Sequence, residues 1–101
     1  MVWLAIMVLV SNIEAARALE DTLLTTLVAS YVESYGGSAS TRRGKAVDLN
    51  HLRDFFGPSA TIGDLTHSSI QEFLDFRTDT GDAPATVKRR LATVKHFCRT
   101  I

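Results

Sequence analysis

The sequence has little cysteine, little proline and no excess of charge of either sign. Cys98 is the only cysteine, which excludes an internal disulfide and a zinc site built on cysteine thiolates. The three histidines, His51, His67 and His96, follow no recurring ligand spacing, so we expect no metal and no cofactor. Lysine and arginine balance aspartate and glutamate at 11 each, so bulk charge favours neither nucleic acid nor a membrane as partner.

Long apolar runs are also missing, except at the start of the chain. The uncharged stretch 1–10 is well short of the ~20 residues that span a bilayer, so we expect no membrane association. It has the length of a signal-peptide core but no Lys or Arg precedes it, which leaves a small exported protein as a third-ranked hypothesis. We instead expect residues 1–19 to form a hydrophobic extension or extra helix beside one domain at 20–101, in the cytoplasm.

Helical periodicity is what the sequence has in abundance. Apolar residues at helical spacing predict helices over about 12–35, 40–56, 67–79 and 84 to the end of the chain. A break near residue 21 stays open, because Asp21-Thr22 can cap a second helix within the first stretch. We therefore predict an all-α fold, a compact bundle of four to five helices.

The predicted ends rest on capping and stop signals. Either Ser38 or Ser40 can cap the second helix, Thr66 the third, and Pro84 suits a first helical turn. Gly36-Gly37 is expected to end the first helix, because glycine enters the left-handed C-cap conformation without a steric cost. Gly57-Pro58 and Gly81 are expected to end the next two helices. No internal repeat and no strand signal beyond the first ten residues is found.

The last predicted helix separates an apolar face from a basic one. Its apolar face is predicted to bury Val87, Leu91, Val94, Cys98 and Ile101. Nearly opposite lie Lys88, Ala92, Lys95 and Arg99, with Arg89 and His96 beside them and no acidic residue among them. Such a stripe neutralises phosphates, and a helix fits the major groove of DNA, although a charged stripe is more often only a solvated face.

The second predicted helix adds to the basic signal. It opens with Arg42-Arg43, whereas Lys45 lies along the apolar face and is expected to pack. Residues 41–101 hold ten Lys and Arg against seven acids, and residues 1–40 hold one against four. Arg90 projects away from the other bases of its helix, so we interpret it as structural, paired with an acid such as Asp48 or Asp54.

From Ser40 onward the chain contains three groups of residues in a fixed order. They are Thr41, Asp48-Leu49, Leu52 and Phe55-Phe56, then Ile62 to Thr66 with Ile70, Phe73 and Leu74, and then Ala85 to Leu91 followed by Val94 and Phe97. In this order they resemble the core-binding, SAM-like domain of tyrosine recombinases and phage integrases. The predicted first helix also fits, so that the likeness extends over about 20–101. Lys45 departs from the pattern, because the family often has an aromatic residue there.

The resemblance implies a DNA-binding module that clamps a recombination site, with strand exchange carried out by a following catalytic domain. We expect no catalysis here, and Tyr31 and Tyr35 sit at core spacing rather than as nucleophiles. The implied partner is double-stranded DNA, with self-association in a synapse through the full-length protein. Phosphate contacts are expected from Arg42, Arg43, Lys88, Arg89, Lys95 and Arg99, and a base contact from Asn50. The alternative is a helical protein-interaction module without a nucleic-acid partner.

Overall fold

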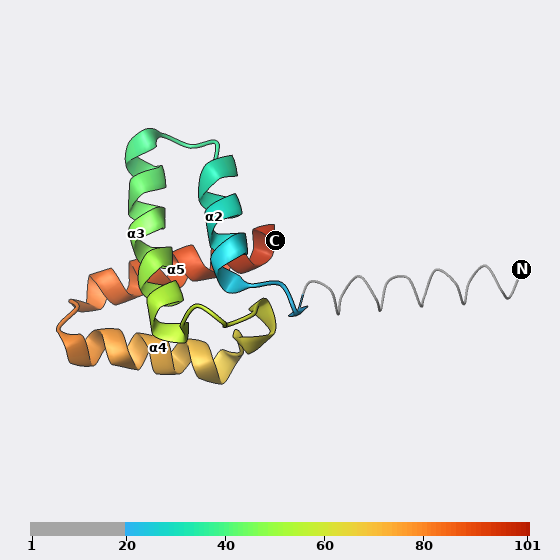
Figure 1. Ribbon diagram of the computed structural model, residues 1–101. Helices are drawn as coiled ribbons and strands as arrows, with labels where there is room; N and C mark the ends of the chain where they lie inside the picture. Colours follow the sequence, from blue (N-terminus) through green and yellow to red (C-terminus); the bar gives the residue numbers. More distant parts are fainter. Residues whose placement is uncertain (1–19) are drawn as a thin grey trace, which may run out of the picture.

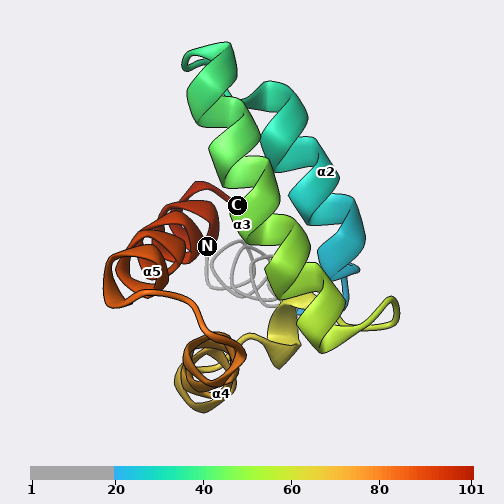
Figure 2. The ribbon, with the colours of Figure 1, turned by 90° about the vertical axis from the view of Figure 1, so that its left-hand side faces the viewer.

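The computed structural model describes residues 20–101, and they form a bundle of α-helices (Figure 1). Its elements in chain order are α2 (Leu24–Ser34), α3 (Ala39–Phe56), the 3-10 turn η1 (Ile62–Asp64), α4 (His67–Thr80) and α5 (Pro84–Thr100). The paired helices α2 and α3 run side by side, and α4 and α5 cross them (Figures 1 and 2). The described part of the chain contains no strand beyond one isolated β-bridge, so the predicted all-α bundle is confirmed.

The helices α3, α4 and α5 begin where the capping signals predict. Ser38 is the N-cap of α3, and its Oγ accepts a hydrogen bond from the backbone N–H of Thr41 at 3.1 Å. Thr66 caps α4 through the N–H of Ser69, whose own hydroxyl oxygen accepts from the N–H of Thr66 at 2.8 Å. Pro84 occupies the first turn of α5, where a missing N–H costs no helical hydrogen bond.

The first predicted helix is shorter than its periodicity indicated. Its stretch 12–19 lies outside the described residues, and α2 begins at Leu24, after the break that the sequence left open. The N-cap is Leu23 rather than Asp21-Thr22, the pair that the sequence offered as an alternative, and no side-chain hydrogen bond caps this end. Leu23 forms the bridge with Thr61, and the N–H of Leu24 donates to the carbonyl of Ala60 at 2.9 Å. Pairing with the segment before η1 therefore holds this stretch extended.

The end of α2 is also built differently from the prediction. The helix ends at Ser34, and its C-cap Tyr35 has an extended backbone. Neither Gly36 nor Gly37 has a positive φ, so the expected left-handed glycine cap is wrong here, whereas Gly57 (φ 92°) and Gly81 (φ 112°) end α3 and α4. An Nη2–H of Arg42 donates to the backbone carbonyl of Tyr35 at 2.7 Å. This side chain therefore satisfies a carbonyl at the end of the helix, as the backbone N–H groups of a glycine cap would otherwise do.

The core lies where α2, α3, α4 and α5 meet. Its buried hydrophobic residues are Leu24, Val28, Tyr31, Leu49, Leu52, Ala60, Phe73, Leu74, Val94 and Phe97. Tyr31 packs edge-on against Phe97 with ring centroids 5.5 Å apart, as a core tyrosine does. Its hydroxyl also hydrogen-bonds His96 Nδ1.

The buried face of α5 is rotated from the predicted one. Arg90, Thr93, Val94 and Phe97 are buried, while Leu91 is half-buried and Cys98 is exposed. The placement of Cys98 in the core is therefore wrong, although partial burial still raises the pKa of its thiol. The reason is polar: Arg90 and Thr93 both bond a buried carboxylate on α3, which turns this line of α5 inward.

Candidate functional site

A buried carboxylate, Asp48, joins α3 to α5. The residue is 1% exposed, and its Oδ1 accepts hydrogen bonds from Arg89 Nη2 and Arg90 Nη1, each at 2.9 Å. Its Oδ2 accepts from the hydroxyl of Thr93 at 2.8 Å. A buried charge is tolerated when it is paired and hydrogen-bonded, and here three donors from one helix do both. The expected structural role of Arg90, paired with Asp48, is confirmed.

Asp82 continues this network toward α4. It accepts from Arg90 Nε at 2.8 Å and from Arg77 Nε and Nη2 at 2.8 and 3.0 Å. The hydrogen bonds from Arg77 and then Arg90 hold the pKa of the Asp82 carboxyl well below its usual range. Arg90 thus bridges two carboxylates, and its guanidinium ties α5 both to α3 and to the loop after α4.

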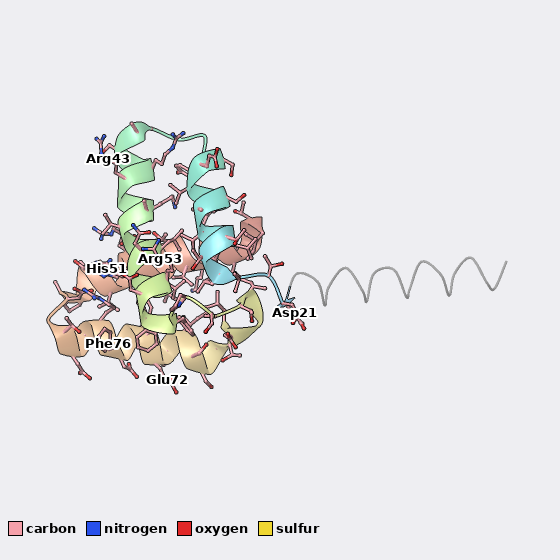
Figure 3. All side chains as sticks on the ribbon, viewed as in Figure 1. Asp21, Arg43, His51, Arg53, Glu72 and Phe76 are labelled. Carbon is pink, nitrogen blue, oxygen red and sulfur yellow. The ribbon has the colours of Figure 1, made fainter. Side chains whose placement is uncertain are left out.

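His51 on α3 lies at the edge of the same network. Its Nδ1 is 3.3 Å from Arg77 Nη1, and its side chain is on the flank of α3 shown in Figure 3. Burial, and then the positive charges of Arg77 and Arg90, lower the pKa of His51. A neutral imidazole therefore suits this position better than an imidazolium.

The face of α5 opposite the core carries cations of a different kind. Lys88, Lys95 and Arg99 are exposed, together with the small residue Ala92 between them. None of these three cations forms a salt bridge with any residue in 20–101. Lys95 and Arg99 line a cleft of about 370 Å³ between α4 and α5, whose other walls include Ile70, Leu74 and Leu91. Their charges are therefore free for a solvent-side partner.

The predicted site residues on α3 separate by their contacts. Arg43 is exposed at the start of the helix and projects from the bundle (Figure 3), and Asn50 is exposed about two turns further along the same side of α3. Arg42 is exposed as well, but one of its nitrogens is used by the Tyr35 carbonyl. Arg43 and Asn50 thus lie open to solvent, while Arg42 also has a structural task.

A second cleft, of about 210 Å³, lies between the first half of α3 and α5. It is lined by Thr41, Gly44, Lys45, Asp48, Arg89 and Thr93. Arg89 is therefore the predicted α5 cation that shares a surface with the start of α3, while Lys95 and Arg99 face the α4 side. Lys45 stacks over the Tyr35 ring at 5.3 Å, which fits the expected packing role, yet it also reaches this cleft. The sequence placed Lys45 on the apolar face of its helix and did not indicate that it lines this cleft.

Neither a metal centre nor a membrane span is found in the described residues. Residues 20–101 contain no group of three or more His, Cys, Asp or Glu side chains placed to hold a metal ion. No helix within this range combines the length and apolarity needed to cross a bilayer.

Comparison with protein families identifies the domain. Residues 22–100 match the model of the phage integrase N-terminal SAM-like domain. This match covers well over half of the 101 residues, so the chain belongs to that family and contains a recombinase-related, core-binding domain. Searches of curated proteins and of solved structures gave no match.

Proposed function

We propose that this domain binds double-stranded DNA as the core-binding module of a site-specific tyrosine recombinase or integrase. The observation that carries the proposal is a set of exposed cations that have no carboxylate partner within residues 20–101, namely Lys88, Lys95 and Arg99 on the outward face of α5. Cations already paired with carboxylates have less charge to offer a phosphate, whereas these can displace the condensed counterions of DNA. Arg43 and Arg89 extend the basic surface toward α3.

Within this proposal the residues have distinct tasks. Arg42, Arg43, Lys88, Arg89, Lys95 and Arg99 contact phosphates and set the register of the protein on the duplex, and Asn50 contacts a base edge. A small residue, Ala92, lets α5 approach the groove closely. Strand exchange belongs to a catalytic domain of the parent protein, which acts in the cytoplasm and assembles into a synapse with other copies.

The test is the salt dependence of duplex binding, measured by fluorescence anisotropy with a labelled duplex. Affinity should fall steeply as salt rises, because each neutralised phosphate releases counterions. Lys95→Ala combined with Arg99→Ala should reduce the slope of log K against log salt by about 2, if each side chain contacts one phosphate. Arg53→Ala is the matched control, because Arg53 already pairs with Asp54 at 3.4 Å.

A second candidate function is a protein-interaction module, and exposed apolar side chains favour it. Phe76 on α4 is 49% exposed (Figure 3) and Val47 on α3 is 48% exposed. Salt-independent binding, or no binding at low ionic strength, would support this alternative. Because an isolated half of a clamp loses the contribution of its linked half, a negative result is checked with the full-length parent protein.

A further inference from the structure

The cleft between α3 and α5 presents a cationic surface above a neutralised acid. Among the lining residues within 20–101 the one carboxylate is that of Asp48, which is buried and whose oxygens already accept from Arg89, Arg90 and Thr93. What remains for a ligand is the guanidinium of Arg89, the hydroxyl of Thr41 and the side chain of Lys45, whose ammonium lies 5.3 Å from the centre of the Tyr35 ring. The Thr41 Oγ1 accepts from the Ser38 hydroxyl at 2.8 Å, so its own proton is free to donate.

The wall at Gly44 is open to close approach. Apart from its two chain neighbours and the nearby backbone of α3, no atom of residues 20–101 lies within 4 Å of the position that a Cβ of Gly44 would occupy. A ligand can therefore come closer to the α3 backbone here than at any position with a side chain. Two cations, one hydroxyl and bare backbone suit a phosphodiester, which carries one negative charge and accepts hydrogen bonds only.

Arg89 differs from the other cations of α5 because it is both exposed and held. Its side chain is 57% exposed, while one nitrogen bonds the buried Asp48 at 2.9 Å. A guanidinium has five N–H donors in a rigid plane, so fixing one edge orients the donors that remain. Side chains that are ordered before binding lose less conformational entropy when the ligand arrives.

We infer that the α3–α5 cleft is a phosphodiester site, in which Arg89, Lys45 and Thr41 hold one DNA phosphate and Asp48 is the residue that positions Arg89. The inference rests on the proposed DNA-binding function and deepens it, because it separates one oriented contact from the unconstrained cations Lys88, Lys95 and Arg99. The oriented contact sets where the domain sits along the DNA backbone, and the others add charge.

The direction in which Asp48→Asn changes duplex affinity shows whether Asp48 acts by positioning Arg89 or only through its charge. Asp48→Asn removes a negative charge next to the proposed phosphate, so charge alone would make duplex binding tighter. Positioning predicts the reverse, a loss of affinity of about tenfold, because Arg89 is no longer held. In the Arg89→Lys background the same Asp48→Asn change should cause no further loss, since a lysine offers no rigid fork to orient.

Arg89→Lys by itself keeps the charge and tests the cleft even if the Asp48 variant does not fold. It should weaken duplex binding about tenfold with an unchanged salt slope, whereas the matched change Arg99→Lys should alter affinity less than about twofold. Anisotropy at several salt concentrations measures both, and circular dichroism checks that each variant is folded.

The outcomes separate this inference from the proposed function. Equal effects of Arg89→Lys and Arg99→Lys, or tighter binding by a folded Asp48→Asn variant, overturn the cleft while leaving salt-dependent DNA binding in place. No duplex binding by the unsubstituted chain and by its full-length parent overturns both. A loss confined to Arg89→Lys and Asp48→Asn, and not additive between them, supports the cleft.

Discussion

The inward and outward sides of α5 use the same residue types for opposite purposes. Inward, Arg90 is 7% exposed and bonds two carboxylates, Asp48 and Asp82. Outward, Lys88, Lys95 and Arg99 have no carboxylate partner within the described residues. Arg89 stands between the two sides, with one nitrogen on Asp48 and most of its side chain in solvent. A basic residue on this helix therefore acquires its role from its angle around the helix axis and from the acid it meets there.

The largest effect that tests this comparison is on stability. Arg90→Ala should lower the free energy of unfolding by about 3–5 kcal/mol, because it leaves a buried carboxylate without its main partner. Urea unfolding followed by circular dichroism measures this loss. Lys95→Ala is the control from the outward side and should stay within about 0.5 kcal/mol. Similar losses for the two variants would contradict the division of the helix into two sides.

Arg89→Ala should show that the intermediate residue contributes little to folding. Its side chain is more than half exposed, so solvent screens its ion pair, and Arg90 and Thr93 still serve Asp48. We expect a loss below about 1 kcal/mol in the same urea experiment. A loss as large as that of Arg90→Ala would place Arg89 with the structural cations.

The smallest expected effect concerns pH, through His51. Because the pKa of His51 is lowered in the folded protein, the unfolded chain binds a proton more readily. The contribution of neutral His51 to stability is therefore fully present above pH 6.5, the ordinary pKa of histidine. It decreases as the pH falls through and below that value. Asp82 adds nothing in this window, because its pKa is held below the ordinary aspartate value of 3.8.

His51→Gln tests this pH dependence against the outward cations, which have no such coupling. The variant should lose part of the decrease in urea midpoint between about pH 8 and about pH 5.5. An equal decrease in the variant and the unsubstituted chain would show that other groups cause it. Lys88→Ala, as a control on the outward face, should keep the full decrease.

Local signals predicted the helix ends well wherever one residue decides the geometry. Ser38, Thr66, Pro84, Gly57 and Gly81 act as their residue types indicate, since capping and positive φ depend on a few atoms. Local signals were not enough at either end of α2: the sequence left a break near residue 21 open, and the predicted glycine cap at the other end is wrong. There the deciding partners, Ala60 and Arg42, come from other parts of the chain.

The candidate site divides in the same way. Helical phase was enough to place Lys88, Lys95 and Arg99 outside and Arg90 inside. It did not bring Lys45 and Thr41 to the cleft beside Arg89, because that needs the packing of α3 on α5. It also placed Cys98 in the core, because the spacing of apolar residues does not include the hydrogen bonds by which Arg90 and Thr93 bind Asp48.

By itself, the order of residues determined that this chain is helical, where three of its helices begin and which cations of α5 face away from the core, because these follow from contacts within one or two turns. Only the tertiary structure decided how far α5 is rotated, which arginines are neutralised and which groups meet between α3 and α5. The physical reason is that a buried charge must find its partner at a distance in sequence, as Asp48 does 41 to 45 residues further on, and the backbone turns to accommodate it.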